Sequence, residues 1–152
     1  MLTAPSKKTP NGIIYENKLT KKIIFMKIIN SKLHGILDYV VSFIIIISPW
    51  LLGFADGKAE MWIPIILGIA SIIYSVVTRY ELGIWKVLPF KTHLTFDALS
   101  GIGLAASPWI FGFANNIYLP HLIFGILEIA VVAFTESQAH PRLRALTGRP
   151  LA

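Results

Sequence analysis

Two stretches of the chain, HGILDYVVSFIIIISPWLLGFA at residues 34–55 and HLTFDALSGIGLAASPWIFGFA at residues 93–114, are copies of one pattern. They align without a gap, and each reads His-x-x-x-Asp, a nine-residue apolar spacer, then Ser-Pro-Trp-x-x-Gly-Phe-Ala. A second apolar stretch follows each copy, with a proline near its start and a glycine about one helical turn further on. These residues are Pro64 and Gly68 in the first unit, and Pro120 and Gly125 in the second. The chain is therefore a tandem duplication of a two-segment unit.

The apolar segments are long enough to cross a lipid bilayer. Each has about 17–22 residues, and a helix that rises about 1.5 Å per residue needs about 20 of them to span the hydrocarbon core. The segments show no polar face at helical period, as expected for helices surrounded by lipid and by other helices. They are Leu33–Phe54, Met61–Val77, Leu94–Phe113 and Ile117–Phe134.

Composition agrees with a membrane protein. Hydrophobic residues make up 55% of the chain and charged residues 14%, with a mean hydropathy of +0.66. These are too few charges to cover a soluble globule, and four buried helices would leave no sequence for a soluble shell. We therefore predict an all-α membrane protein with four transmembrane helices formed by two tandem parallel helical-hairpin repeats. Because each repeat has two helices, a pseudo-twofold axis should run along the membrane normal.

The expected organisation has four parts. A polar and basic cytoplasmic segment at 1–30, expected to be disordered, precedes repeat 1 at 31–85; repeat 2 at 86–137 is followed by a basic cytoplasmic tail at 138–152. The sequence leaves open whether translation starts at Met1 or at Met26.

The basic residues predict the orientation. The chain has 14 Lys and Arg, and all but Lys58 lie before the first apolar segment, between the second and third, or after the fourth. The positive-inside rule then places both termini, and the loop between the second and third segments, in the cytoplasm. The expected partners are the lipid bilayer and anionic lipid headgroups. A homo-oligomer or a further membrane partner stays open, and we expect no nucleic-acid binding because no aromatic residues interleave with the charges.

With both copies of His-x-x-x-Asp and Ser-Pro-Trp-x-x-Gly-Phe-Ala complete, the chain resembles the SPW repeat family of small bacterial integral membrane proteins, over about residues 31–136. The resemblance implies a multi-pass location in the cell (inner) membrane and a tandem two-helix repeat. It implies no biochemical activity and supplies no catalytic residues. The defining positions that it implies are His34, Asp38, Ser48, Pro49 and Trp50, and His93, Asp97, Ser107, Pro108 and Trp109.

The Ser-Pro-Trp segment has a structural interpretation. Pro49 cannot donate a hydrogen bond, so the carbonyl of Ile45 loses its helical partner, and the Ser48 hydroxyl can bond back to a carbonyl one turn earlier. Trp50 is suited to the membrane interface and Gly53 to leaving the helix. The second copy repeats this with Ser107, Pro108, Trp109 and Gly112. The alternative is a broken helix whose freed carbonyls line a polar cavity, as in transporters.

Histidine and aspartate four residues apart share a helix face in each repeat. Twofold symmetry predicts a cross-pairing of His34 with Asp97 and of His93 with Asp38. Such a cluster would fix the first helix against the third; the alternative is a proton or cation site, because ionisable residues inside membranes are often functional. Two His and two Asp could also hold a divalent metal, but a His-x-x-x-Asp spacing is common by chance, and we assign no metal ligands.

Glu128 breaks the symmetry of the repeats, because Ser71 lies at the nearest equivalent position. It falls near the middle of the fourth segment, where an ionised carboxylate is costly, so it should be protonated or paired. His121 lies on about the same face, nearer the outside. The candidate proton or ion site therefore consists of Asp38, Asp97, Glu128 and His121.

No catalytic motif occurs in the chain. It has no cysteine, no Walker loop, no G-x-G-x-x-G fingerprint and no G-x-S-x-G elbow. We expect no enzyme activity and no cofactor, and a structural or accessory membrane protein in which the small residues of LSGIGLAAS (99–107) help helices to pack. The alternative is a small proton- or ion-coupled transporter or channel.

Overall fold

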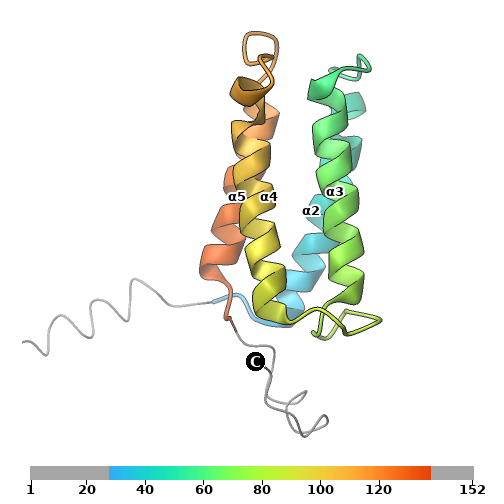
Figure 1. Ribbon diagram of the computed structural model, residues 1–152, viewed down its shortest axis with the longest axis vertical. Helices are drawn as coiled ribbons and strands as arrows, with labels where there is room; N and C mark the ends of the chain where they lie inside the picture. The colour runs from blue at the N-terminus through green and yellow to red at the C-terminus, as the bar shows by residue number, and fades with distance from the viewer. Residues whose placement is uncertain (1–27, 138–152) are drawn as a thin grey trace, which may run out of the picture.

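The computed structural model describes residues 28–137, and this part of the chain forms four α-helices arranged as two antiparallel hairpins (Figure 1). The helices are α2 (Ser31–Leu51), α3 (Ala59–Val77), α4 (Phe90–Ile110) and α5 (Leu119–Phe134). α2 and α3 make the first hairpin, and α4 and α5 make the second. The predicted all-helical class is confirmed. The predicted disorder of the N-terminal segment, the basic tail at 138–152 and the start at Met26 lie outside the described residues.

The helices differ by a few residues from the apolar segments because polar residues extend them at one end. Asn30 caps α2 by accepting a hydrogen bond from the Leu33 amide at 2.9 Å. α4 begins at Phe90 rather than Leu94, so the polar turn before Leu94 is helical. α2 and α4 end before the predicted boundaries, and Gly53 and Gly112 then have φ values of 75° and 74°. This left-handed backbone favours glycine, and both glycines follow their helices as predicted.

Each Ser-Pro-Trp segment satisfies the carbonyl that its proline leaves free. The buried hydroxyl of Ser48 donates to the Ile45 carbonyl at 2.8 Å, and Ser107 donates to the Leu104 carbonyl at the same distance. The back-bonding serines are therefore confirmed in both copies. Trp50 and Trp109 lie at the ends of α2 and α4 with more than half of their surface exposed.

Glycines bring the helices of each hairpin close together. A Cβ atom on Gly125 of α5 would lie only 2.4 Å from the carbonyl oxygen of Gly101 on α4. Gly68 of α3 meets the Ser42 carbonyl of α2 in a similar way. In the segment 99–107, Gly101 therefore allows α4 and α5 to pack closely. A Cβ atom added at Gly103 would meet no atom within 4 Å.

The two hairpins contact each other less than their own helices do, and they meet mainly where α3 faces α4 and α2 faces α5. Both ends of the described chain lie at the same end of the bundle as the connection between α3 and α4 (Figure 1). There the Ile29 amide donates to the Phe134 carbonyl at 3.0 Å, and the Glu136 amide donates to the Ile29 carbonyl at 2.9 Å.

Two of the described helices, α2 and α3, are long and apolar enough to cross a membrane. α5 is apolar but has only 16 residues. Large apolar side chains cover the outside of all four helices, with exposed fractions near 60% for Phe43, Ile73, Leu99 and Ile123.

Candidate functional site

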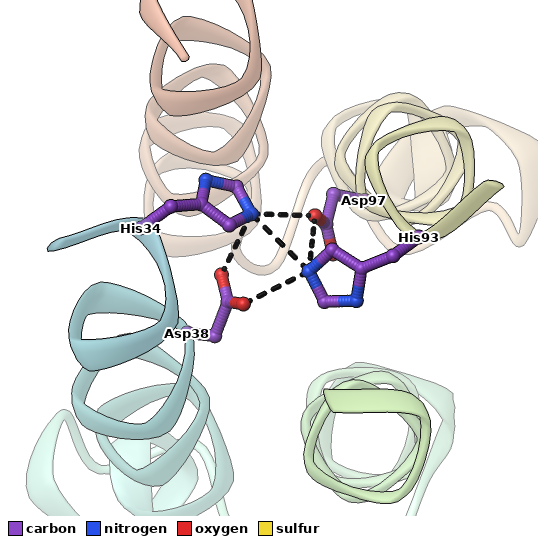
Figure 2. A group of neighbouring side chains, drawn as sticks. All are labelled: His34, Asp38, His93 and Asp97. Carbon is purple, nitrogen blue, oxygen red and sulfur yellow. Dashed lines mark hydrogen bonds and ion pairs between the residues drawn. The ribbon is translucent and has the colours of Figure 1, made fainter. Parts of the chain in front are cut away.

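Four side chains from α2 and α4 converge at the end of the bundle where the two chain ends lie (Figure 2). Nε2 of His34 lies 3.0 Å from Oδ2 of Asp97, and Nε2 of His93 lies 2.9 Å from Oδ2 of Asp38. The pairs within each helix are slightly longer, at 3.3 Å for His34 with Asp38 and 3.1 Å for His93 with Asp97. We call these four residues the His–Asp centre.

The repeat explains why the four side chains meet. His34 and Asp38 lie four residues apart in the first turns of α2, so they share one helix face. His93 and Asp97 occupy the equivalent turns of α4, and their side chains point towards those of His34 and Asp38 (Figure 2). The reciprocal pairing expected from pseudo-twofold symmetry is the arrangement found. Both imidazoles are 0% exposed and the carboxylates 8% and 7%, so the centre is shielded from the surroundings.

A threonine at the end of each hairpin determines which nitrogen of the histidine carries hydrogen. Thr78 follows α3 and donates its hydroxyl to the Tyr74 carbonyl at 2.6 Å, while its Oγ1 lies 3.1 Å from Nδ1 of His93. Because a hydroxyl has a single hydrogen, Thr78 must accept at the second contact, and His93 Nδ1 must be the donor.

The second hairpin repeats this arrangement. Thr135 follows α5, donates to the Val131 carbonyl at 2.6 Å and lies 3.0 Å from Nδ1 of His34. Nδ1 of His34 is therefore protonated as well. Both histidines consequently turn Nε2 towards the centre, where the two Nε2 atoms are 3.2 Å apart.

α3 supplies a hydroxyl to each aspartate. The Tyr74 hydroxyl donates to Oδ1 of Asp97 at 2.6 Å, and Ser75 donates to Oδ2 of Asp38 at 3.4 Å. Each of the four residues of the centre is thus oriented by a hydroxyl from outside it. Such supporting hydrogen bonds fix the geometry of a polar cluster in a low-dielectric environment.

Aromatic rings close the centre on the side of the chain ends. Phe90 stacks on His93 with a centroid distance of 5.8 Å and meets the edge of His34 at 5.6 Å. Tyr80 packs on Phe90 and completes a small buried cluster with Leu94. Tyr80 lies in the connection between α3 and α4, and burial raises the pKa of its hydroxyl, which therefore stays neutral.

Glu128 faces the same space as the centre. A pocket between the hairpins, with room for a water molecule, is lined by His34, Asp38, Asp97, Ser71 and Glu128 among others. Oε2 of Glu128 is buried and has no hydrogen-bond partner among residues 28–137. The structure therefore brings Glu128 together with Asp38 and Asp97, as the candidate ion site requires.

His121 does not belong to this group. Its Nε2 lies 2.9 Å from the carbonyl oxygen of Glu60, and its ring packs between Phe54 and Phe113 at the opposite end of the bundle. The structure thus divides the four candidate residues: Asp38, Asp97 and Glu128 share one pocket, and His121 helps to join the hairpins elsewhere.

The arrangement could hold a metal ion, which the sequence did not lead us to assign. His34, Asp38, His93 and Asp97 each offer one ligand atom, and all four atoms lie within 4.8 Å of one another. Sequence reasoning also missed the supporting hydroxyls of Tyr74, Ser75, Thr78 and Thr135. The threonines had a recognisable pattern, because each is the first polar residue after the second apolar segment of its repeat.

The comparisons with known proteins identify the family and no chemistry. The family model described as the SPW repeat domain matches residues 32–135 of the chain. The searches of curated proteins and of solved structures give no match. The match covers both hairpins except Ser31, the first residue of α2, and it includes the His–Asp centre and both Ser-Pro-Trp segments.

Proposed function

The chain belongs to the SPW repeat family, and we propose that it is a multi-pass membrane protein with a non-enzymatic, structural or accessory role. Its two hairpins would cross the membrane side by side and be held together by the His–Asp centre. The reciprocal pairing of His34 with Asp97 and of His93 with Asp38 is the observation that carries this proposal.

The helix surfaces support four membrane spans. α2 and α3 have the length and composition of membrane helices. α4 has 21 residues and lies beside α5, so a hairpin that flanks two spanning helices would itself cross the bilayer. The large apolar side chains on the outside of the bundle then face lipid tails instead of water.

The charges support cytoplasmic termini. The side that the chain ends share with the connection between α3 and α4 would carry all the Lys and Arg except Lys58. Lys58 pairs with Asp56 at 3.0 Å, and this hydrogen bond holds the pKa of the Asp56 carboxyl below its usual range. The positive-inside rule counts Lys and Arg, so thirteen of them expected on the side of the chain ends against Lys58 alone on the other support cytoplasmic termini.

Polar contacts matter for joining the hairpins because lipid tails are as apolar as leucine, so no hydrophobic force drives helices together in a bilayer. The His–Asp centre joins α2 to α4 at one end of the bundle. At the other end, His121 and Asn116 of the second hairpin reach Glu60 of the first. Helices of different hairpins contact each other much less than the two helices within each hairpin do, so the two polar joints would set the relative position of the hairpins.

Cysteine labelling tests the membrane arrangement, because the chain has no cysteine of its own. Single Lys58→Cys, Asn115→Cys and Lys86→Cys variants are exposed to a membrane-impermeant maleimide on intact spheroplasts, and then again after lysis. We expect the first two to be labelled on intact spheroplasts and Lys86→Cys only after lysis. Labelling of all three before lysis would contradict the four-span arrangement.

Reconstitution tests the structural role. We expect the parent protein in proteoliposomes to give no proton or cation flux above that of empty vesicles, and Asp97→Asn to lower the resistance of the bundle to unfolding. Flux in the parent that Asp97→Asn abolishes, with the helical content unchanged, would overturn the structural role.

A proton or ion pathway is the second candidate, and one observation favours it. Glu128 lines the pocket together with Asp38 and Asp97, and its buried Oε2 has no hydrogen-bond partner among residues 28–137. Carboxylates placed this way inside a bundle are typical of proton relays. Glu128→Gln should then abolish flux while leaving the bundle folded. Ser42→Ala, which changes another residue lining the pocket, is the control that should retain it.

A further inference from the structure

We propose that the His–Asp centre binds one divalent transition-metal ion, with Zn²⁺ as the best fit. The ligands are Nε2 of His34, Nε2 of His93 and one carboxylate oxygen each from Asp38 and Asp97. This site goes beyond the structural role proposed above and does not depend on which way the helices cross the membrane.

The hydrogen positions prepare both histidines for a metal. Thr78 and Thr135 accept hydrogen bonds from Nδ1 of His93 and His34, because each threonine hydroxyl donates its own hydrogen to a helix carbonyl. A neutral imidazole with hydrogen on Nδ1 presents a lone pair on Nε2, the form that coordinates metals. In that neutral form, the Nε2 lone pairs of both histidines would point into the centre, where the two nitrogen atoms are 3.2 Å apart.

The distances fit tetrahedral coordination. Ligands about 2.0–2.1 Å from a tetrahedral ion lie about 3.3–3.4 Å from one another. Both His–Asp pairs that join the hairpins, at 3.0 and 2.9 Å, are close to this spacing. Nε2 of His93 and Oδ2 of Asp97 are 3.1 Å apart, and the two nitrogens are 3.2 Å apart. Asp38 presents its other oxygen, Oδ1, to His34 at 3.3 Å, so either Asp38 oxygen can serve as the fourth ligand. All four ligand atoms lie within 4.8 Å of one another, and binding the ion would draw them to the tetrahedral spacing.

Charge favours a divalent cation. With neutral imidazoles the centre carries the two negative charges of Asp38 and Asp97 in a buried position, which is costly without compensation. One divalent ion neutralises both carboxylates and occupies both lone pairs at once. The competing arrangement places a second proton on each imidazole, which brings two like-charged N–H groups within 3.2 Å.

The ligand set selects the class of metal. Imidazole and carboxylate ligands suit Zn²⁺ and other divalent first-row ions, whereas Ca²⁺ requires six or more oxygen atoms and Mg²⁺ a nearly octahedral shell. Every ligand also has an outer partner: Thr135 and Thr78 for the histidines, and Tyr74 and Ser75 for the aspartates. Such partners hold metal ligands in place and strengthen binding.

Metal content tests the site directly. The full-length protein is purified in detergent, stripped with a chelator, dialysed against Zn²⁺ in excess Mg²⁺, and its metal measured by mass spectrometry. We expect about one Zn²⁺ per chain, and Co²⁺ in its place should give the strong visible absorption of a tetrahedral ion. A folded parent protein that retains less than about a tenth of a Zn²⁺ ion per chain would overturn the proposal. The histidines and aspartates would then be held together by hydrogen bonds without a metal.

Matched variants locate the ion. His34→Gln and His93→Gln should lower the affinity at least tenfold, whereas His121→Gln removes an equally buried histidine outside the centre and should retain the full equivalent. An equal loss in His121→Gln would overturn the site.

A second variant keeps the proposal testable if the histidine variants do not fold. Thr78→Val with Thr135→Val leaves all four ligands intact and removes the acceptors for Nδ1, together with the hydrogen bonds that the two hydroxyls donate to helix carbonyls. Loss of such outer partners lowers metal affinity by about 10–100-fold. An unchanged affinity in this double variant would overturn the proposed role of the threonines and with it the argument for the tautomer.

Discussion

Asp97 on α4 lies 3.0 Å from His34 on α2, so a carboxylate of the second repeat is paired with an imidazole of the first. We expect the two residues to be energetically coupled. In a double-mutant cycle of His34→Gln and Asp97→Asn, the free energies of unfolding should depart from additivity by about 1–3 kcal/mol, as contacting residues of one network do. Unfolding in mixed detergent, followed by circular dichroism, measures each corner of the cycle.

The control cycle combines His121→Gln with Asp97→Asn. These residues lie at opposite ends of the bundle and share no partner, so their effects should add to within about 0.5 kcal/mol. Equal coupling in both cycles would mean that the variants disturb the bundle as a whole and do not report a direct pair.

Ser48→Ala should destabilise the protein because it removes the donor to the Ile45 carbonyl, which Pro49 leaves without a helical partner. An unsatisfied buried carbonyl costs about 1–3 kcal/mol. The double variant Ser48→Ala with Pro49→Ala restores a backbone N–H at the position that normally bonds to Ile45, so it should recover most of that loss. Absence of recovery would show that the serine acts in another way.

Gly125→Ala should separate α5 from α4, because the added Cβ atom would lie 2.4 Å from the Gly101 carbonyl oxygen and 2.6 Å from the Ala105 amide nitrogen. Both neighbours are backbone and cannot turn away, so we expect a loss of about 1–3 kcal/mol in the free energy of unfolding. Gly103→Ala is the control: it adds the same methyl group to α4 with no neighbour within 4 Å and should be neutral or slightly stabilising.

Glu128→Leu should stabilise the bundle in the absence of a bound cation. The carboxyl group is buried, its Oε2 has no partner in the described part of the chain, and a carboxylate in mid-membrane costs about 2.5–3.5 kcal/mol on insertion scales. We expect a gain of about 1 kcal/mol or more, measured by detergent unfolding. A loss of similar size would indicate that Glu128 has a partner in the pocket, as the ion pathway requires.

The duplication made much of the centre predictable. Equal spacing of His and Asp in both repeats, combined with twofold symmetry, leads to the reciprocal pairs, and the missing N–H of Pro49 leads to the Ser48 hydrogen bond. Both inferences follow from local geometry that repeats. The helix boundaries were less accurate, because hydropathy marks the apolar part of a helix and not the polar turn before Leu94 that continues it.

The two hydroxyls that support the aspartates could not be read from the sequence, because their contacts depend on how the hairpins dock. Tyr74 and Ser75 come from α3 alone, and the equivalent part of α5 is apolar, so symmetry gives no indication of them. His121 was grouped with Glu128 because the two residues lie on about the same face of α5. It is too far along the helix axis to reach the pocket that Glu128 lines.

Each repeat contributes one histidine and one aspartate to the centre, so a chain with a single hairpin would hold only half of it. Such a chain could complete the set only by pairing with a second copy about a true twofold axis, and the centre would then form at a rate set by how often copies meet in the membrane. Joining the two copies in one polypeptide makes that encounter intramolecular and raises the effective concentration of each half for the other. It also allows the two repeats to diverge in sequence. Glu128 in the second repeat takes the place of Ser71 in the first, and a symmetric dimer of identical hairpins could not have acquired this difference in one copy alone.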